Sequence, residues 1–186
     1  CLYRPFDIRH IFYHKAVIDR PRPEVMRHIL AGENMGLVGD RTTSVDFPFT
    51  HVFASSSPID VRVLPDYGGA PYIFPLYLYP DSSKKDLYSD LKESKKRNPN
   101  LSLKVMAILK DAYGREPLSE EVFAYVYSVL YSASYRRKYA QFLKSDFPRV
   151  PFTGDPDLFV KLGKLGDRLV DLHLLRSSEL DKPICR

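Results

Sequence analysis

Tryptophan is absent from this chain of 186 residues, and cysteine occurs only twice, as Cys1 and Cys185 near the two ends. This spacing gives no basis for a disulfide framework or a zinc knuckle, so the pattern favours a reducing, cytoplasmic setting. No apolar run approaches the roughly 18 residues that a membrane helix needs. Because the chain begins without methionine or a signal-peptide pattern, we expect a fragment of a longer polypeptide.

The motifs that catalytic sites need are also missing. No Gly-rich turn ends in Gly-Lys-Ser/Thr, so nothing indicates a phosphate-binding loop. The chain has neither a nucleophile elbow nor the tetrapeptide with which adenine-N6 methyltransferases hold a flipped base. His10 and His14 lie four residues apart, but a third metal ligand is not evident. We therefore predict no catalytic residue, no metal site and no bound cofactor for this chain alone.

One literal match to a catalytic pattern is the Pro-Asp…Glu-x-Lys arrangement of metal-dependent nucleases. Asp81, Glu93 and Lys95 form it, and in such enzymes the two carboxylates hold Mg²⁺ while the lysine positions a water. Those nucleases place the Glu-x-Lys on a buried strand, whereas here it falls in a lysine-rich run that is typical of a solvated loop. The nuclease is the least favoured of the alternatives.

The chain does contain an aromatic, strand-like first half and a strongly helical second half. Residues 70–79 predict a buried strand, residues 101–112 a helix, and Ser119 the N-cap of the next helix. We predict an α+β fold with a mixed, β-rich part followed by an all-helical part. The predicted boundaries are 1–80 for the α/β part, 81–100 for a basic loop or linker, and 101–186 for the helical part.

Leucines repeat every three or four residues in the last predicted helix, which starts at Asp155. This spacing predicts a narrow apolar seam that packs on another helix. Together with a tyrosine face, the seam raises the alternative of a protein-interaction module that docks another domain. The leucines are Leu158, Leu162, Leu165, Leu169 and Leu172, and the tyrosines are Tyr125, Tyr127 and Tyr131.

Positive charge is modest overall, at +5, but it is clustered. Residues 84–97 carry six basic and three acidic side chains, and residues 136–149 carry five basic side chains against Asp146 alone. Lysine and arginine clusters give salt-sensitive affinity for phosphates, so the clusters favour DNA as a partner. Solubility and helix-terminal charge would explain the same residues without DNA.

Several blocks of the sequence, in this order, resemble the C-terminal target-recognition (specificity) domain of Type ISP single-chain restriction-modification enzymes. The similarity covers nearly the whole chain, and the blocks that start at Tyr3, Tyr72 and Glu120 are specific in combination. The blocks are YRPFDIRHIFY (3–13), RPRPEVMRHIL (20–30), ENMGLV (33–38), PYIFPLYLYP (71–80), NPNLS (98–102), EEVFAYVYSVLYSASYRRKYAQFLKSDFPRVPF (120–152) and LFVKLGKLGDRLVDLHLL (158–175).

The resemblance implies a domain that recognises an asymmetric site in double-stranded DNA and presents it to an upstream N6-adenine methyltransferase domain. It implies S-adenosylmethionine, ATP and Mg for the parent enzyme only. It also implies that the N-terminal block is part of the structural framework and does not read DNA. Reading loops vary in such families, so the candidates come from segments without matching motifs and from basic clusters. We predict base reading by Arg41, Thr42, Thr43, Ser55, Ser56 and Ser57, and phosphate contacts by Arg20, Arg22, Lys84, Lys85, Lys95, Lys96, Arg97, Arg136 and Arg137.

Overall fold

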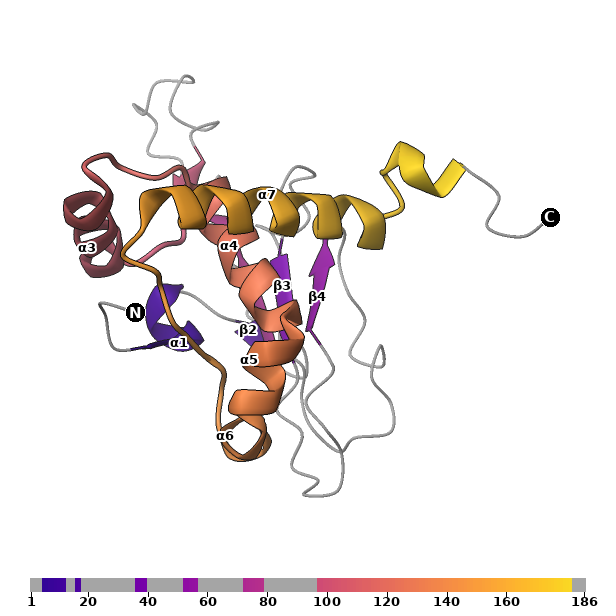
Figure 1. The fold of residues 1–186 in the computed structure, drawn as a ribbon, viewed down its shortest axis with the longest axis horizontal. Helices are drawn as coiled ribbons and strands as arrows, with labels where there is room; N and C mark the ends of the chain where they lie inside the picture. The colour runs from indigo at the N-terminus through magenta and orange to yellow at the C-terminus, as the bar shows by residue number, and fades with distance from the viewer. Residues whose placement is uncertain are drawn as a thin grey trace, which may run out of the picture.

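A computed structural model shows a mixed α and β architecture with a helical C-terminal part (Figure 1), which confirms the predicted α+β class. In the described part of the chain, no helix is both long and apolar enough to span a membrane. The structure describes residues 5–12, 16–17, 36–39, 52–56, 72–78 and 97–181.

Four short strands form an antiparallel sheet in the order β2-β5-β3-β4. Leu37 of β3 lies opposite Phe74 on one side and Ala54 on the other, so β3 and β5 are central. Among the described strands β4 pairs with β3 alone, and it is therefore an edge of this sheet. The strands are β2 (Ala16–Val17), β3 (Gly36–Gly39), β4 (Val52–Ser55) and β5 (Tyr72–Pro75).

Two further strand pairs join the first half of the chain to the second. β1 (Phe6–Asp7) pairs with β8 (Arg149–Val150), and β6 (Tyr77–Leu78) pairs with β7 (Asn98–Pro99), both antiparallel. The buried side chain of Asn100 reinforces the second junction, because its Nδ2 donates to the Pro75 carbonyl at 2.8 Å. β7 lies in the predicted linker, and β8 is a two-residue strand within the part predicted to be helical.

The helices of the second half follow the predicted pattern closely. Helix α3 ends at Gly114, which adopts a positive φ of 66° that glycine takes without steric cost. Helix α4 begins at Ser119, so the N-cap is Leu118, and its N–H donates to the Glu121 carboxylate at 2.8 Å. Ser119 is therefore the first helical residue rather than the predicted cap. The helices are α1 (Ile8–Ile11), α3 (Leu103–Tyr113), α4 (Ser119–Tyr131), α5 (Ala133–Lys138), α6 (Ala140–Ser145), α7 (Pro156–His173) and the 3-10 turn η3 (Ser178–Asp181).

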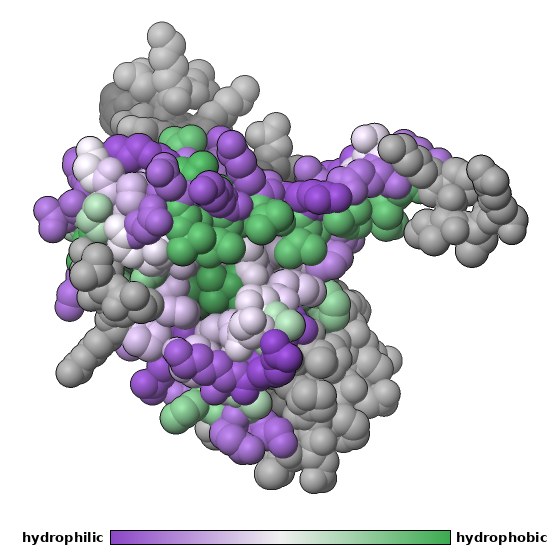
Figure 2. Space-filling view, viewed as in Figure 1, coloured by the Kyte–Doolittle hydropathy of each residue, from purple (hydrophilic) through white to green (hydrophobic). Residues whose placement is uncertain are grey.

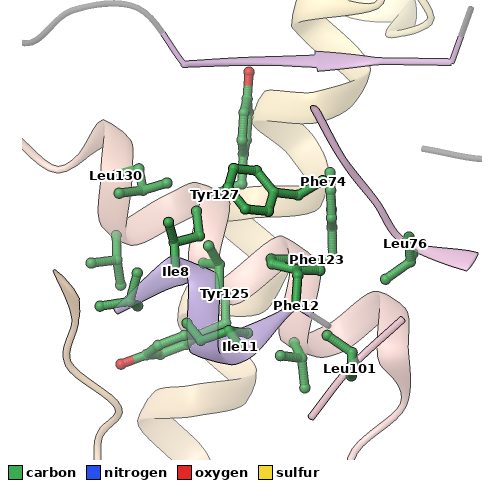
Figure 3. Packing of buried hydrophobic residues seen from close by; sticks show 14 of the residues in the cluster. Ile8, Ile11, Phe12, Phe74, Leu76, Leu101, Phe123, Tyr125, Tyr127 and Leu130 are labelled. Carbon is green, nitrogen blue, oxygen red and sulfur yellow. The ribbon is translucent and has the colours of Figure 1, made fainter. Parts of the chain in front are cut away.

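Helix α4 is the centre of the core, because all of its residues from Val122 to Leu130 are buried. Tyr125 and Tyr127 extend from it in opposite directions, and side chains of α1 and β5 pack around it (Figure 3). A single hydrophobic cluster thus includes residues from both sides of the predicted linker. The division at residues 80 and 100 stays a prediction, since most of 81–100 lies outside the described residues.

Helix α7 packs on α4 through a face of glycines flanked by two apolar side chains. Phe159, Gly163, Gly166 and Val170 are buried, and they recur with the same spacing as the leucines but one residue later. At Gly166 the two helices approach so closely that an added Cβ would lie 1.9 Å from the Ala124 carbonyl oxygen. The α4–α7 contact is the most extensive between any two described elements.

The predicted leucine seam lies beside this face and is only partly covered. Leu158 is 42% exposed and Leu165 is 53% exposed, while Leu162, Leu169 and Leu172 are half-buried. Hydrophobic surface is visible along this side of α7 (Figure 2). The helix does pack on another helix, as predicted, but the leucines are not the residues at the centre of the contact.

The N-terminal block is built into the core rather than projecting from it. Ile8, Ile11 and Phe12 are buried, and the Asp7 carboxylate caps α1 by accepting from the Arg9 N–H at 2.9 Å. Burial of Asp7 acts to raise its pKa, but hydrogen bonds and charge from Arg9 outweigh it and hold the pKa below the usual value. Arg9 also donates to Asp146, 3.1 Å away, so the Asp7–Arg9 ion pair links α1 to the end of α6.

Candidate nucleic-acid interface

Three consecutive basic residues of α5 follow directly after the C-terminal end of α4. Arg136 is half-buried: its Nε donates to the Leu130 carbonyl at 2.6 Å, and its guanidinium lies 4.6 Å from the Tyr131 ring centroid. Its Nη2 is buried without a hydrogen-bond partner among the described residues. Arg137 and Lys138 are exposed. Of the two predicted phosphate contacts on α5, Arg137 is therefore the more accessible, while Arg136 closes the last turn of α4.

Arg97 lies at the opposite end of α4. Its guanidinium stacks 4.3 Å from the Tyr77 ring centroid, and its Nη2 is 3.7 Å from the Glu120 carboxylate. Tyr77 also donates a hydrogen bond to Glu120, so these three side chains form one group over the first turn of α4. The pKa of Tyr77 is raised to about 12, chiefly by burial and then by Glu120. A phosphate at Arg97 would have to compete with this carboxylate.

The described phosphate candidates therefore divide into two groups rather than one patch. Ten residues of helix separate Glu120 from Leu130, which corresponds to about 15 Å along the helix axis. A duplex would have to run beside α4 to meet both groups at once.

Ser55 is the last residue of the edge strand β4 and Ser56 follows it; both are half-buried. Helix α4 is attached to the start of this strand, because the Tyr131 hydroxyl donates to the Val52 carbonyl at 2.5 Å. The structure thus places one base-reading candidate at the end of β4 and a second directly after it. Ser55 lies about 10 Å along the strand from Val52.

The other predicted site residues fall outside the described residues, and their roles stay predictions. They are Arg20, Arg22, Arg41, Thr42, Thr43, Ser57, Lys84, Lys85, Lys95 and Lys96, together with Asp81 and Glu93 of the nuclease alternative.

Comparison with known families decides what kind of domain carries this arrangement. The family model of the Type ISP C-terminal specificity domain matches residues 1–185. The chain belongs to this family. No curated protein matches the specificity domain.

Solved structures agree with the family. The specificity domain is similar to the DrdV–DNA complex seen by cryo-electron microscopy, with a TM-score of 0.60 and 26% identity over 80% of this chain and 13% of that chain. A second similar structure is a nuclease-deletion mutant of the Type ISP restriction-modification enzyme LlaGI in complex with a DNA substrate mimic, with a TM-score of 0.51 and 25% identity over 84% of this chain and 11% of that chain. A third is the ATP-dependent Type ISP restriction-modification enzyme LlaBIII bound to DNA, with a TM-score of 0.60 and 22% identity over 84% of this chain and 9% of that chain. At this identity, the third similarity supports the fold alone. The specificity domain thus spans 9% to 13% of the length of these chains.

The tyrosines of α4 are residues whose role in the specificity domain the sequence did not reveal. Tyr125 and Tyr127 are 2% and 0% exposed, so they belong to the domain's own core and cannot form a docking face for another domain. Tyr131 bonds to β4, as described above. A contact between a helix residue and a strand residue 79 positions earlier leaves no periodic signal in a single sequence, so no spacing rule could have found it.

Four acidic side chains of α4 and α7 lie near one another. Burial raises the pKa of Asp167, and the nearby carboxylates of Asp171, Glu121 and Glu120 raise it further. Among the described residues, no three or more histidine, cysteine, aspartate or glutamate side chains are placed to hold a metal ion. These carboxylates therefore repel one another, and no metal site among the described residues balances their charge.

Replacing Asp167 by asparagine is expected to stabilise the domain slightly at neutral pH. The pKa of Asp167 is higher in the folded state than its unfolded value of 3.8, so ionised Asp167 opposes folding. This cost grows as the pH rises from the unfolded pKa to the folded pKa and is fully present above both. The side chain is exposed, so the gain should be at most about 0.5 kcal/mol. Urea unfolding at pH 7 and pH 3 measures it, and the gain should vanish at pH 3. Asp157→Asn is the control with the opposite sign, because Asp157 lies in the first turn of α7, where a negative charge is favourable.

Proposed function

We propose that this domain recognises a specific sequence in double-stranded DNA. The observation that carries the proposal is the match of the specificity-domain family to residues 1–185. The similarity to DrdV, whose solved structure is a DNA complex, supports it. The exposed Arg137 on α5 and the polar end of β4 offer the two kinds of group that such recognition needs, a phosphate contact and hydrogen-bonding side chains.

In a longer polypeptide, the domain would present an asymmetric site to an N6-adenine methyltransferase domain. S-adenosylmethionine, ATP and Mg would belong to the other domains of that polypeptide, and we assign none of them to residues of this chain. The enzyme would act in the cytoplasm on cellular or phage DNA. The two terminal cysteines are compatible with that reducing compartment.

Selection from a random duplex library tests the proposal directly. The chain is incubated with the library at moderate salt, bound duplexes are amplified over several rounds, and the enriched sequences are read. One asymmetric site should emerge, and duplexes that match it should bind on the order of 10³-fold more tightly than unrelated duplexes. Enrichment of no sequence, with equal affinity for all duplexes, would contradict the proposed function.

Replacing Arg137 by alanine should weaken binding to every duplex by a similar factor. A phosphate contact carries no sequence information, so the slope of log K against log salt should become shallower by about one unit. Filter binding or fluorescence anisotropy at four salt concentrations measures the slope. Arg168→Ala is the matched control, because Arg168 is an exposed arginine on α7 that pairs with Glu179, and its loss changes the net charge equally. Equal slopes for the two variants would rule out Arg137 as a phosphate contact.

A further inference from the structure

The Tyr131 hydroxyl of α4 lies at the edge strand β4, where it donates to the Val52 carbonyl at 2.5 Å. Tyr127 lies beside Tyr131 on the same helix, with ring centroids 4.8 Å apart. Among the described strands only β3 pairs with β4, so the Tyr131 bond ties β4 to α4 in addition to its ladder with β3.

The two tyrosines are held by residues from other helices. Tyr127 is fully buried, and its hydroxyl lies 2.6 Å from Nδ1 of His173 at the end of α7. The Tyr131 ring lies 4.8 Å from the ring centroids of both Tyr127 and His173. Arg136 of α5 covers the Tyr131 ring. Three helices thus fix the position of the Tyr131 hydroxyl that bonds to β4, and we name Tyr127, Tyr131 and His173 the tyrosine brace.

The brace lies beside the strand whose end carries Ser55 and Ser56. A strand at the edge of a sheet is held by one ladder of hydrogen bonds, and the register of a short strand is weakly specified without further contacts. Here the brace adds a bond at Val52, three residues before Ser55. Any shift of β4 relative to α4 would break this bond and move the serines.

We infer that the tyrosine brace is a positioning device for base reading. It fixes β4 so that Ser55 and Ser56 meet base edges in one register, and it contributes to discrimination between DNA sequences without touching DNA. This inference rests on the proposed function. Hydroxyl removal at the brace should therefore reduce discrimination, while phosphate affinity and the salt slope stay as in the wild type.

Tyr131→Phe is the test variant, and Tyr135→Phe is its matched control. Tyr135 is buried on the neighbouring helix, and its hydroxyl donates to the Arg149 carbonyl at 3.0 Å, so it makes the same type of bond but to β8. For each variant we would measure affinity for the selected duplex and for an unrelated duplex. Tyr131→Phe should lower the ratio of the two affinities about tenfold, whereas Tyr135→Phe should leave it unchanged. Equal ratios in the two variants would overturn the inference.

Amide hydrogen exchange of the free chain separates this inference from the proposed function. Tyr131→Phe removes the donor of the Val52 bond, so the amides of β4 should exchange about five to ten times faster than in the wild type. In Tyr135→Phe they should exchange at the wild-type rate. Unchanged exchange in β4 of Tyr131→Phe would show that the brace does not hold β4, whatever DNA the domain binds. Failure of the proposed function would appear instead as a wild-type chain without a preferred duplex.

Discussion

Replacing Gly166 by alanine should destabilise the domain by at least about 3 kcal/mol, the upper end of the cost of overpacking a core. The new Cβ would lie 1.9 Å from the carbonyl oxygen of Ala124 and 2.6 Å from its carbonyl carbon. These are backbone atoms in the middle of α4, so no side-chain rotation can relieve the contact. The helices α4 and α7 would have to separate along the most extensive contact in the described structure.

Gly163→Ala is the control for this prediction. Gly163 lies one turn earlier on the same face, but its added Cβ would meet only the Glu121 carbonyl oxygen, at an ordinary contact distance of 3.8 Å. Alanine favours a helix over glycine by up to about 1 kcal/mol, so this variant should be neutral or slightly more stable.

Urea unfolding followed by circular dichroism measures both variants under the same conditions. The midpoint should fall strongly for Gly166→Ala and stay or rise for Gly163→Ala. A small loss in Gly166→Ala, comparable with that of an exposed substitution, would mean that the two helices are further apart than the structure shows.

The glycine face also shows how far the sequence predicted this fold. The three-to-four-residue leucine spacing correctly indicated a helix that packs on another helix. It placed the contact one residue too early, because hydrophobic periodicity gives weight to large apolar side chains and none to glycine. Phe159, Gly163, Gly166 and Val170 have the same spacing. They allow a closer approach than leucines would, so the glycines, rather than the leucines, set the position of the contact.

Local chemistry was predicted better than long-range contacts. The strand predicted at 70–79 and the helix predicted at 101–112 follow from adjacent residues, and the structure confirms them as β5 with β6 and as α3. The bond from Tyr131 to Val52 joins a helix to a strand 79 residues earlier, which no local pattern encodes. Arg136, a predicted phosphate contact, also closes the end of α4 through its bond to the Leu130 carbonyl, and charge clustering alone did not indicate this bond.

The kind of site was predicted at the level of the family, and the individual contact residues stay predictions. The blocks that carry the resemblance are largely architectural, as the buried N-terminal block illustrates. Residues that read bases differ between relatives by their nature, so a family resemblance names the domain without naming its contacts. The tyrosine brace beside Ser55 and Ser56 is an argument for their proposed role in base reading, and it comes from the structure rather than from the sequence.

Replacing Phe152 by alanine should cost about 3–5 kcal/mol of folding free energy, as is typical when a fully buried phenylalanine is removed. Phe152 is 0% exposed, stacks on Tyr125 with ring centroids 5.1 Å apart, and meets Phe6 edge-on at 6.0 Å. It therefore joins the N-terminal strand β1 to the central helix α4. Phe142→Ala is the control, because the same atoms are removed from a side chain that is 70% exposed, and the expected change lies within about 0.5 kcal/mol.

A double-mutant cycle then tests whether the N-terminal block is architecture. If Phe6 and Phe152 stabilise one cooperative unit, Phe6→Ala and Phe152→Ala should be less costly together than the sum of the single variants, by about 0.5–1.5 kcal/mol. Urea unfolding monitored by circular dichroism and by tyrosine fluorescence should give coincident single transitions for all four proteins. Additive losses, or a separate early transition, would show instead that β1 is only loosely attached. The block would then be free to act as a junction to a preceding domain rather than as part of this core.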